Sequence, residues 1–203
     1  MTPSLDPTHH FAALADWQPD PTGALTGQIP KGWMQGRAAF GGLPAAIGLN
    51  AARRLVPPER TPRAVHAALL APLGPAPATV TARVLRAGRA LTQAEAELWQ
   101  GDTLCARVTA AFGQSRPSQI TVPSPTAPAM PAPETLPALP YLEGITPTFT
   151  QHFEYRFASR HLPFTGATTA RLAGWVRHRT TPGAPHGALL GLLDAWPAPV
   201  MVL

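Results

Sequence analysis

The stretch AAFGGLPAAIGLNAARRL, residues 38–55, has the pattern of a helix that opens on two glycines, where a capping Ser, Thr or Asp is usual. Apolar residues recur at helical spacing, two arginines suit the negative end of the helix, and Pro57 and Pro58 end it. The alanines and glycines of this stretch give little side-chain bulk. We therefore expect a helix from Gly42 that a sheet can approach closely.

Four segments after this helix are predicted to be strands, namely residues 63–71, 78–88, 90–100 and 103–113. In the last segment apolar residues alternate with polar ones, which is the period of a half-buried strand and puts Cys105 on the face opposite Leu104. The turns between the segments are short enough for antiparallel hairpins. The pattern predicts an α+β fold in which an antiparallel sheet wraps round one helix.

Proline crowds residues 114–147, and proline disfavours helix interiors and central strands. We interpret this segment as a linker in extended geometry. After it the order begins again, with strands predicted over 149–159 and 168–180 and a helix over 183–196.

A faint internal repeat relates the two parts of the chain. The segment from Gly32 to Arg37 precedes the first helix much as the segment from Gly174 to Arg179 precedes the second, and Gly41 has a counterpart in Gly183. Trp33 and Trp175, which lie in these two segments, are interpreted as core anchors.

Composition limits the functions that this chain can have. Its net charge of +5 comes almost wholly from scattered arginines, which suits anionic small molecules but gives no signature of nucleic-acid binding. No apolar run is long enough for a membrane span, and the N-terminus has no secretion-signal pattern, so the expected location is the cytoplasm. Cys105 is the single cysteine and is interpreted as a packed small residue, and the seven histidines show no metal-binding spacing.

The segment from Trp33 to Gly113 resembles the first half of the acyl-CoA thioesterase II (TesB-like) family. The resemblance rests on an ordered set of short motifs: Phe40-Gly41-Gly42 before an Ala-rich helix, Leu70 and Pro72 after a strand, Arg86-x-Gly88-Arg89 at a hairpin, and Gln100-Gly101 at the next turn.

This resemblance implies a double hotdog fold, with a first hotdog over 11–113, the linker over 114–147 and a partial second hotdog over 148–203. The later strands of the second hotdog are not found before Leu203. Either the chain is a shortened version of a longer protein, or a partner subunit completes its core. We expect a homodimer or a higher homo-oligomer, because sheet edges and apolar surface need cover.

The resemblance also implies an acyl-CoA substrate and gives the two glycines a function. Phe40, Gly41 and Gly42 would bind the thioester, with bare backbone N–H groups at the helix N-terminus stabilising a developing oxyanion. The alternative reading is that the glycines only permit tight packing of the helix on the sheet.

The family's catalytic aspartate lies in a segment similar to that of Asp194, so this residue is expected to orient or activate a water molecule. The alternative is a helix-terminal acid exposed to water. Asn50 occupies a mirrored position in the first helix, where an amide cannot act as a base. Arg86 and Arg89 could meet the phosphates of coenzyme A or be solvated hairpin charges. No counterpart of the family's Thr or Ser and Gln partners is found.

These residues favour an acyl-CoA thioesterase that needs no metal or redox cofactor. A second hypothesis is a non-catalytic acyl-CoA-binding or assembly protein that keeps the hotdog shape without the full catalytic set. A hydratase acting on enoyl thioesters is disfavoured, because no paired Asp and His with suitable spacing is found.

Overall fold

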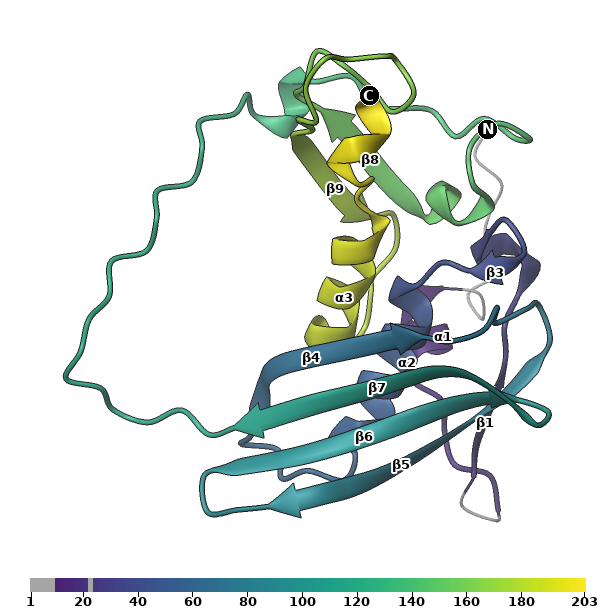
Figure 1. The fold of residues 1–203 in the computed structure, drawn as a ribbon, viewed down its shortest axis with the longest axis vertical. Coiled ribbons are helices and arrows are strands. Elements are labelled where there is room, and N and C mark those ends of the chain that lie inside the picture. The colour runs from purple at the N-terminus through teal and green to yellow at the C-terminus, as the bar shows by residue number, and fades with distance from the viewer. Residues whose placement is uncertain (1–9, 22–23) are drawn as a thin grey trace.

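Helix α2 (Gly42–Arg53) packs against a five-stranded antiparallel sheet in the computed structural model, which describes residues 10–21 and 24–203. The strand order across this sheet is β1 (Leu25–Gln28), β5 (Pro77–Ala87), β6 (Leu91–Gln100), β7 (Thr103–Gly113) and β4 (Thr61–Leu69). Figure 1 shows α2 behind these strands. The predicted helix and the four predicted strands are confirmed, with only small displacements of their ends.

Several short elements precede α2 and have no counterpart in the predictions. They are α1 (Phe11–Ala15), strand β1, the 3₁₀ turn η2 (Lys31–Trp33), and the small hairpin of β2 (Met34–Gln35) and β3 (Ala38–Ala39). The hairpin brings the chain directly to the first turn of α2, because the Phe40 N–H donates to the Trp33 carbonyl oxygen at 3.1 Å.

The small residues of α2 allow a close approach to the sheet, as expected. At Gly48, a Cβ atom would lie 2.5 Å from a methyl carbon of Val108 on β7 and 2.8 Å from the Val108 Cβ. Real side chains do not reach such distances, and the Val108 Cβ cannot swing away. Gly48 is therefore required by packing.

Substituting Gly48→Ala tests this packing directly. Helix propensity alone favours the change by about 1 kcal/mol, whereas overpacking a close contact costs about 1–3 kcal/mol. We expect net destabilisation in urea unfolding. The loss should shrink in a Val108→Ala background, and equal losses in both backgrounds would contradict the contact.

The predicted alternation along β7 fails at its first residues. Cys105 is buried, in agreement with its interpretation as a packed small residue. Leu104, which the alternation predicts to be buried on the opposite face, is only half-buried. The pairing of β6 with β7 shifts its register between Leu98 and Trp99. A bulge of this kind turns the following side chains and breaks the period of two.

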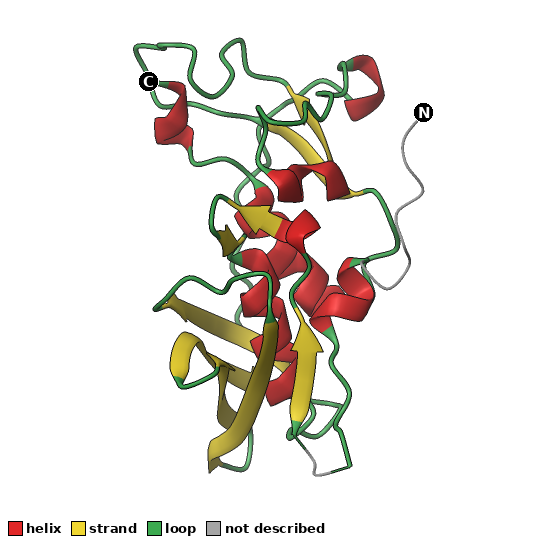
Figure 2. Ribbon diagram, turned by 90° about the vertical axis from the view of Figure 1, so that its right-hand side faces the viewer, coloured by secondary structure: helices red, strands yellow, loops and turns green. Residues whose placement is uncertain are grey.

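The second half contains fewer regular residues than predicted. Within the described part of the chain, residues 114–132 form no helix or strand, and the 3₁₀ turns η3 (Pro133–Thr135) and η4 (Thr148–His152) follow. Strands β8 (Phe153–Phe157) and β9 (Gly174–His178) form an antiparallel pair that is shorter than either predicted strand. Helix α3 (Pro185–Ala195) confirms the predicted helix, and the 3₁₀ turn η5 (Pro199–Val202) follows it. Figure 2 shows the helices between the five-stranded sheet and the β8–β9 pair.

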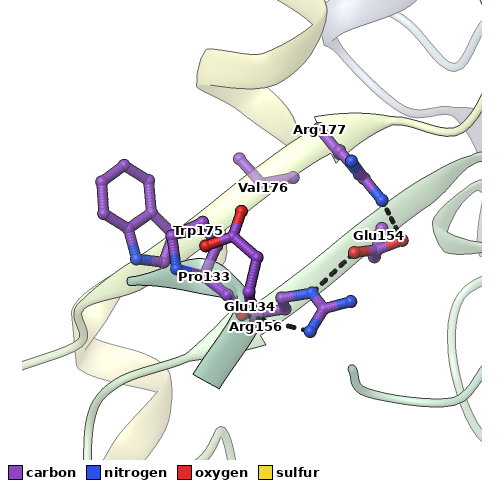
Figure 3. A pocket seen from close by; sticks show the side chains of 7 residues that line it. All are labelled: Pro133, Glu134, Glu154, Arg156, Trp175, Val176 and Arg177. Carbon is purple, nitrogen blue, oxygen red and sulfur yellow. Dashed lines mark hydrogen bonds and ion pairs between the residues drawn. The ribbon is translucent and has the colours of Figure 1, made fainter. Parts of the chain in front are cut away.

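Residues 131–136 of the proline-rich segment are hydrogen-bonded to the outer face of β8 and β9, partly visible in Figure 3. Arg156 donates to the carbonyl oxygens of Pro133 at 3.1 Å and Leu136 at 2.6 Å, and the Trp175 indole N–H donates to Pro131 at 3.0 Å. Trp175 is 40% exposed, so its interpretation as a core anchor is wrong. Its strand neighbour Val176 points inward, which places Trp175 on the outer face.

Trp33 is a core anchor, as predicted, within an aromatic cluster that joins the two halves. Its ring stacks on His152 with 3.9 Å between centroids, and Phe40 stacks on Phe149 at 4.6 Å. Phe153 meets both Trp33 and Phe40 edge-on. Because these residues come from both sides of the linker, the two halves share one core.

Helices α2 and α3 lie antiparallel along faces made of small residues. A Cβ at Gly187, near the start of α3, would lie 3.1 Å from the Asn50 amide nitrogen near the end of α2. A Cβ at Gly42 would lie 3.0 Å from the Gly191 Cα. Gly183, the expected counterpart of the N-cap Gly41, lies one residue before the N-cap of α3 with φ +77°. Within the described residues, no helix is long and apolar enough to cross a membrane.

His178 at the end of β9 links α3 to the aromatic cluster. Its Nε2–H donates to the Ala188 carbonyl oxygen at 3.0 Å, and its ring lies 4.9 Å from Phe11 and 4.8 Å from Phe153. Burial lowers the pKa of His178, and the hydrogen bond to Ala188 opposes this only in part. The folded protein therefore favours the neutral ring.

We expect this histidine to make folding stability fall in mild acid. Because the folded pKa is below the ordinary value of 6.5, the unfolded chain binds the proton more readily, and stability is lost as the pH falls through that value. His178→Gln keeps a donor for Ala188 and removes the titration. Urea unfolding at about pH 7.5 and about pH 5.5 should show a smaller pH-dependent loss in the variant. An unchanged loss would contradict the assignment.

Candidate active site

The bare N-terminus of α2 receives its cap from the other half of the chain. The Gly42 N–H donates to the Asp194 Oδ2 at 2.7 Å, across a separation of 152 residues. Gly41 occupies the N-cap position with no side-chain hydrogen bond of its own. Asp194 thus supplies to α2 the acceptor that a capping Ser, Thr or Asp supplies in most helices.

The negative charge of the Asp194 carboxylate lies between two helix ends, which have opposite effects on its stability. Asp194 is the penultimate residue of α3, where the negative end of its own helix disfavours a carboxylate. The positive end of α2 favours it. Asp194 is exposed, as the alternative reading of the sequence expected, yet its carboxylate is bound and oriented by Gly42.

The two glycine N–H groups differ in their availability. The expectation that both are bare is wrong for Gly42, because its N–H donates to Asp194. Among the described residues, the Gly41 N–H makes no hydrogen bond. Gly41 therefore keeps a free donor at the positive end of α2, directly beside a carboxylate.

Packing requires a glycine at Gly42, whereas a side chain at Gly41 would displace the ends of flexible, exposed side chains. A Cβ at Gly41 would lie 2.7 Å from a methyl group of Leu69 and 3.1 Å from the Asp194 Oδ2. A Cβ at Gly42 would lie 2.6 Å from the Phe40 ring. The functional and packing readings of these glycines are thus compatible, because a side chain at Gly41 would also push on the Asp194 carboxylate.

An open cavity of about 260 Å³ lies over this helix start. Asp194 is the single polar side chain among its described lining residues, and the others are Gly41, Gly42, Ala45, Ala67, Leu69, Leu190 and Leu193. No Ser, Thr or Gln side chain is among the described residues that line it. An apolar wall with one carboxylate and one free N–H suits an apolar substrate with a single polar group.

Phe40 and Asn50 do not line this cavity. Phe40 is fully buried in the aromatic cluster and lies against Gly42. Asn50 donates from its amide to the Ala15 carbonyl oxygen at 2.7 Å and faces Gly187. Asn50 and Gly187 therefore lie close together at the opposite ends of the same two helices from Asp194 and Gly42.

Arg86 and Arg89 lie at the other end of the sheet. Leu69, beside the cavity, pairs with Ala106 on β7, whereas the strand ends beside the Arg86–Arg89 hairpin pair at Gly113. Seven residues of extended strand separate these levels, which is roughly 23 Å. Both arginines are exposed, and within this chain they do not converge with Asp194.

Sequence reasoning missed Tyr155, which contacts the segment that carries Asp194. The Tyr155 hydroxyl donates to the Ala195 carbonyl oxygen at 3.1 Å. The alternation of residues along β8 could have predicted that Tyr155 faces inward. Its hydrogen-bond partner Ala195, however, lies on α3, 40 residues later in the chain, and no local pattern predicts that contact. Within the described residues, no group of three or more His, Cys, Asp or Glu side chains is arranged to hold a metal ion.

Two family models match this chain. A model described as the acyl-CoA thioesterase N-terminal domain matches residues 29–113, and one described as the acyl-CoA thioesterase C-terminal domain matches residues 125–203. The chain belongs to the acyl-CoA thioesterase family. The resemblance to TesB-like thioesterases is thereby confirmed, and the contact of Gly42 with Asp194 joins the two thioesterase domains. A search of curated proteins gave no match.

Solved structures confirm the hotdog fold. A protein of unknown function with a hot dog fold from Alicyclobacillus acidocaldarius aligns with a TM-score of 0.79 and 26% identity, over 95% of this chain and 71% of that one. The acyl-CoA thioesterase II TesB2 from Mycobacterium marinum aligns with a TM-score of 0.69 and 20% identity, over 91% of this chain and 68% of that one. At such identity the second likeness shows the fold alone.

Removing the carboxylate should weaken the helix start as well as any chemistry. We expect Asp194→Ala to lower the free energy of unfolding by about 1 kcal/mol, the usual loss for a helix cap. Asp194→Asn should lose less, because the amide oxygen can still accept from Gly42. Urea unfolding measures both, with Asp102→Asn in the exposed β6–β7 turn as the control. An Asp194→Ala variant as stable as the wild type would contradict the capping role.

Proposed function

We propose that this protein hydrolyses acyl-CoA thioesters to a free acid and coenzyme A, with Asp194 as the general base. The observation that carries the proposal is the 2.7 Å hydrogen bond from Gly42 to Asp194, beside the free N–H of Gly41. This contact supports the proposal because it holds a carboxylate of α3 beside the N-terminus of α2, where a base and an oxyanion donor would both be needed.

The reaction follows from this arrangement. The Asp194 oxygen that does not accept from Gly42 takes a proton from water as the water oxygen attacks the thioester carbonyl carbon. Negative charge forms on the carbonyl oxygen, where the Gly41 N–H and the positive end of α2 stabilise it. The carbon–sulfur bond then breaks, and the carboxylic acid of Asp194 returns its proton to the leaving sulfur.

The cavity walls support an acyl substrate. Leu69, Leu190 and Leu193 give it apolar sides, against which an aliphatic chain can lie. The proposal leaves out Arg86 and Arg89 as coenzyme A contacts within one chain, because they lie at the far end of the sheet. It includes self-association, since Leu69, Leu189 and Leu193 are all more than half exposed.

A non-catalytic acyl-CoA-binding or assembly protein is the second candidate. It is favoured by one observation, namely that Asp194 is the single polar side chain among the described residues lining the cavity. Such a protein would bind acyl-CoA without turning it over. A binding titration that gives affinity in the absence of thiol release would support this candidate over the enzyme.

Thiol release from acyl-CoA substrates of graded chain length tests the proposal. We expect turnover by the wild type and a loss of roughly a hundredfold or more in Asp194→Asn, the usual contribution of a general base. The buried Cys105 thiol gives a background that a substrate-free sample measures.

Asp102→Asn serves as the matched control and should keep full activity. Circular dichroism and urea unfolding confirm that Asp194→Asn is folded. The proposal fails if the folded wild type releases no thiol from any substrate, or if Asp194→Asn retains wild-type turnover.

A further inference from the structure

The end of α3 that carries Asp194 lacks a local cap. The helix stops at Ala195, and the next residue, Trp196, is extended with φ −75° and ψ 126° and precedes Pro197. No glycine follows to fold the chain back onto the last turn, as happens in many helices. The carbonyl oxygens of that turn therefore need partners from elsewhere in the molecule.

Tyr155 supplies one of these partners from β8. Its hydroxyl donates to the carbonyl oxygen of Ala195, the residue directly after Asp194, at 3.1 Å. Tyr155 is 4% exposed, so water does not compete freely for this carbonyl. Burial raises the pKa of Tyr155 well above its ordinary value, and the negative charge of Asp194 raises it further. The hydroxyl thus stays a neutral hydrogen-bond donor.

The position of Tyr155 is itself fixed by several contacts. Its backbone pairs with Val176 of β9, and its carbonyl oxygen accepts from the Leu139 N–H at 2.9 Å. Its ring stacks on Phe157 with 6.3 Å between centroids and lies at an angle to Phe153 at 6.2 Å. A hydroxyl on so firm a support can hold a helix end in place.

We propose that Tyr155 is a positioning residue for Asp194: its hydroxyl holds the last turn of α3 so that the Asp194 carboxylate stays within reach of the Gly42 N–H. Tyr155 does not line the cavity beside Asp194, so it acts through the helix and not on the substrate. This inference rests on the proposed thioesterase function for its kinetic consequences. Its structural consequence, a fixed end of α3, does not depend on that function.

The substitution Tyr155→Phe removes the hydroxyl and keeps the ring. We expect kcat for acyl-CoA hydrolysis to fall about threefold to tenfold, the effect of one hydrogen bond, with KM unchanged. In an Asp194→Asn background the same substitution should have no further effect on kcat, because the carboxylate that it positions is gone. Tyr141→Phe, at the other tyrosine of the chain, is the matched control and should behave as wild type.

Amide hydrogen exchange gives a readout that does not need activity. Exchange at residues 192–195 should be faster in Tyr155→Phe than in wild type and Tyr141→Phe, while the first turn of α3 is unchanged. A wild type without turnover would overturn the thioesterase proposal, and exchange would still decide whether Tyr155 holds the helix end. Unchanged exchange, or an equal loss of kcat with and without the Asp194 carboxylate, would overturn the positioning role.

Discussion

The hydrogen bond from the Gly42 N–H to the Asp194 carboxylate joins the candidate site across the two halves of the chain, and it depends on how closely the two helices pack. It forms only if α2 and α3 lie antiparallel and very close. The approach is possible because small residues line both helices, with Gly42 against Gly191 and Gly187 against Asn50. The aromatic cluster of Phe40, Phe149 and Phe153 then encloses the same helix start from the other side.

Electrostatics and packing lead to the same geometry at this point. A carboxylate near the end of its own helix is unfavourable, and the N-terminus of α2 offsets this by offering an N–H group and the positive end of a helix dipole. A side chain at the N-cap position, Gly41, would instead press on the Asp194 carboxylate, since its Cβ would lie 3.1 Å from Oδ2. The glycines therefore leave the site open to a residue from the other domain.

Much of the first hotdog could be predicted from sequence because its signals are local. The helix from Gly42 and the strand 103–113 follow from periodicity and from the prolines and turns that end them. The predicted strands over 149–159 and 168–180 were too long, because only β8 and β9 find each other as partners. The interpretation of Trp175 is wrong for a related reason, since which face of a strand is buried depends on what packs against it. In β9 the partly buried face is that of Val176 and His178, and the register of β9 against β8 is not specified by the sequence alone.

The candidate site illustrates the same limit of sequence reasoning. Gly42 and Asp194 were both identified from sequence, but their hydrogen bond spans 152 residues and no local pattern encodes it. At the opposite end of the helix pair, Gly187 lies against Asn50. An amide there satisfies the Ala15 carbonyl oxygen but brings no charge and cannot take a proton at neutral pH. The two ends of the helix pair therefore differ in charge, with a carboxylate beside Gly42 and a neutral amide beside Gly187, and only the carboxylate can serve as the base that we propose.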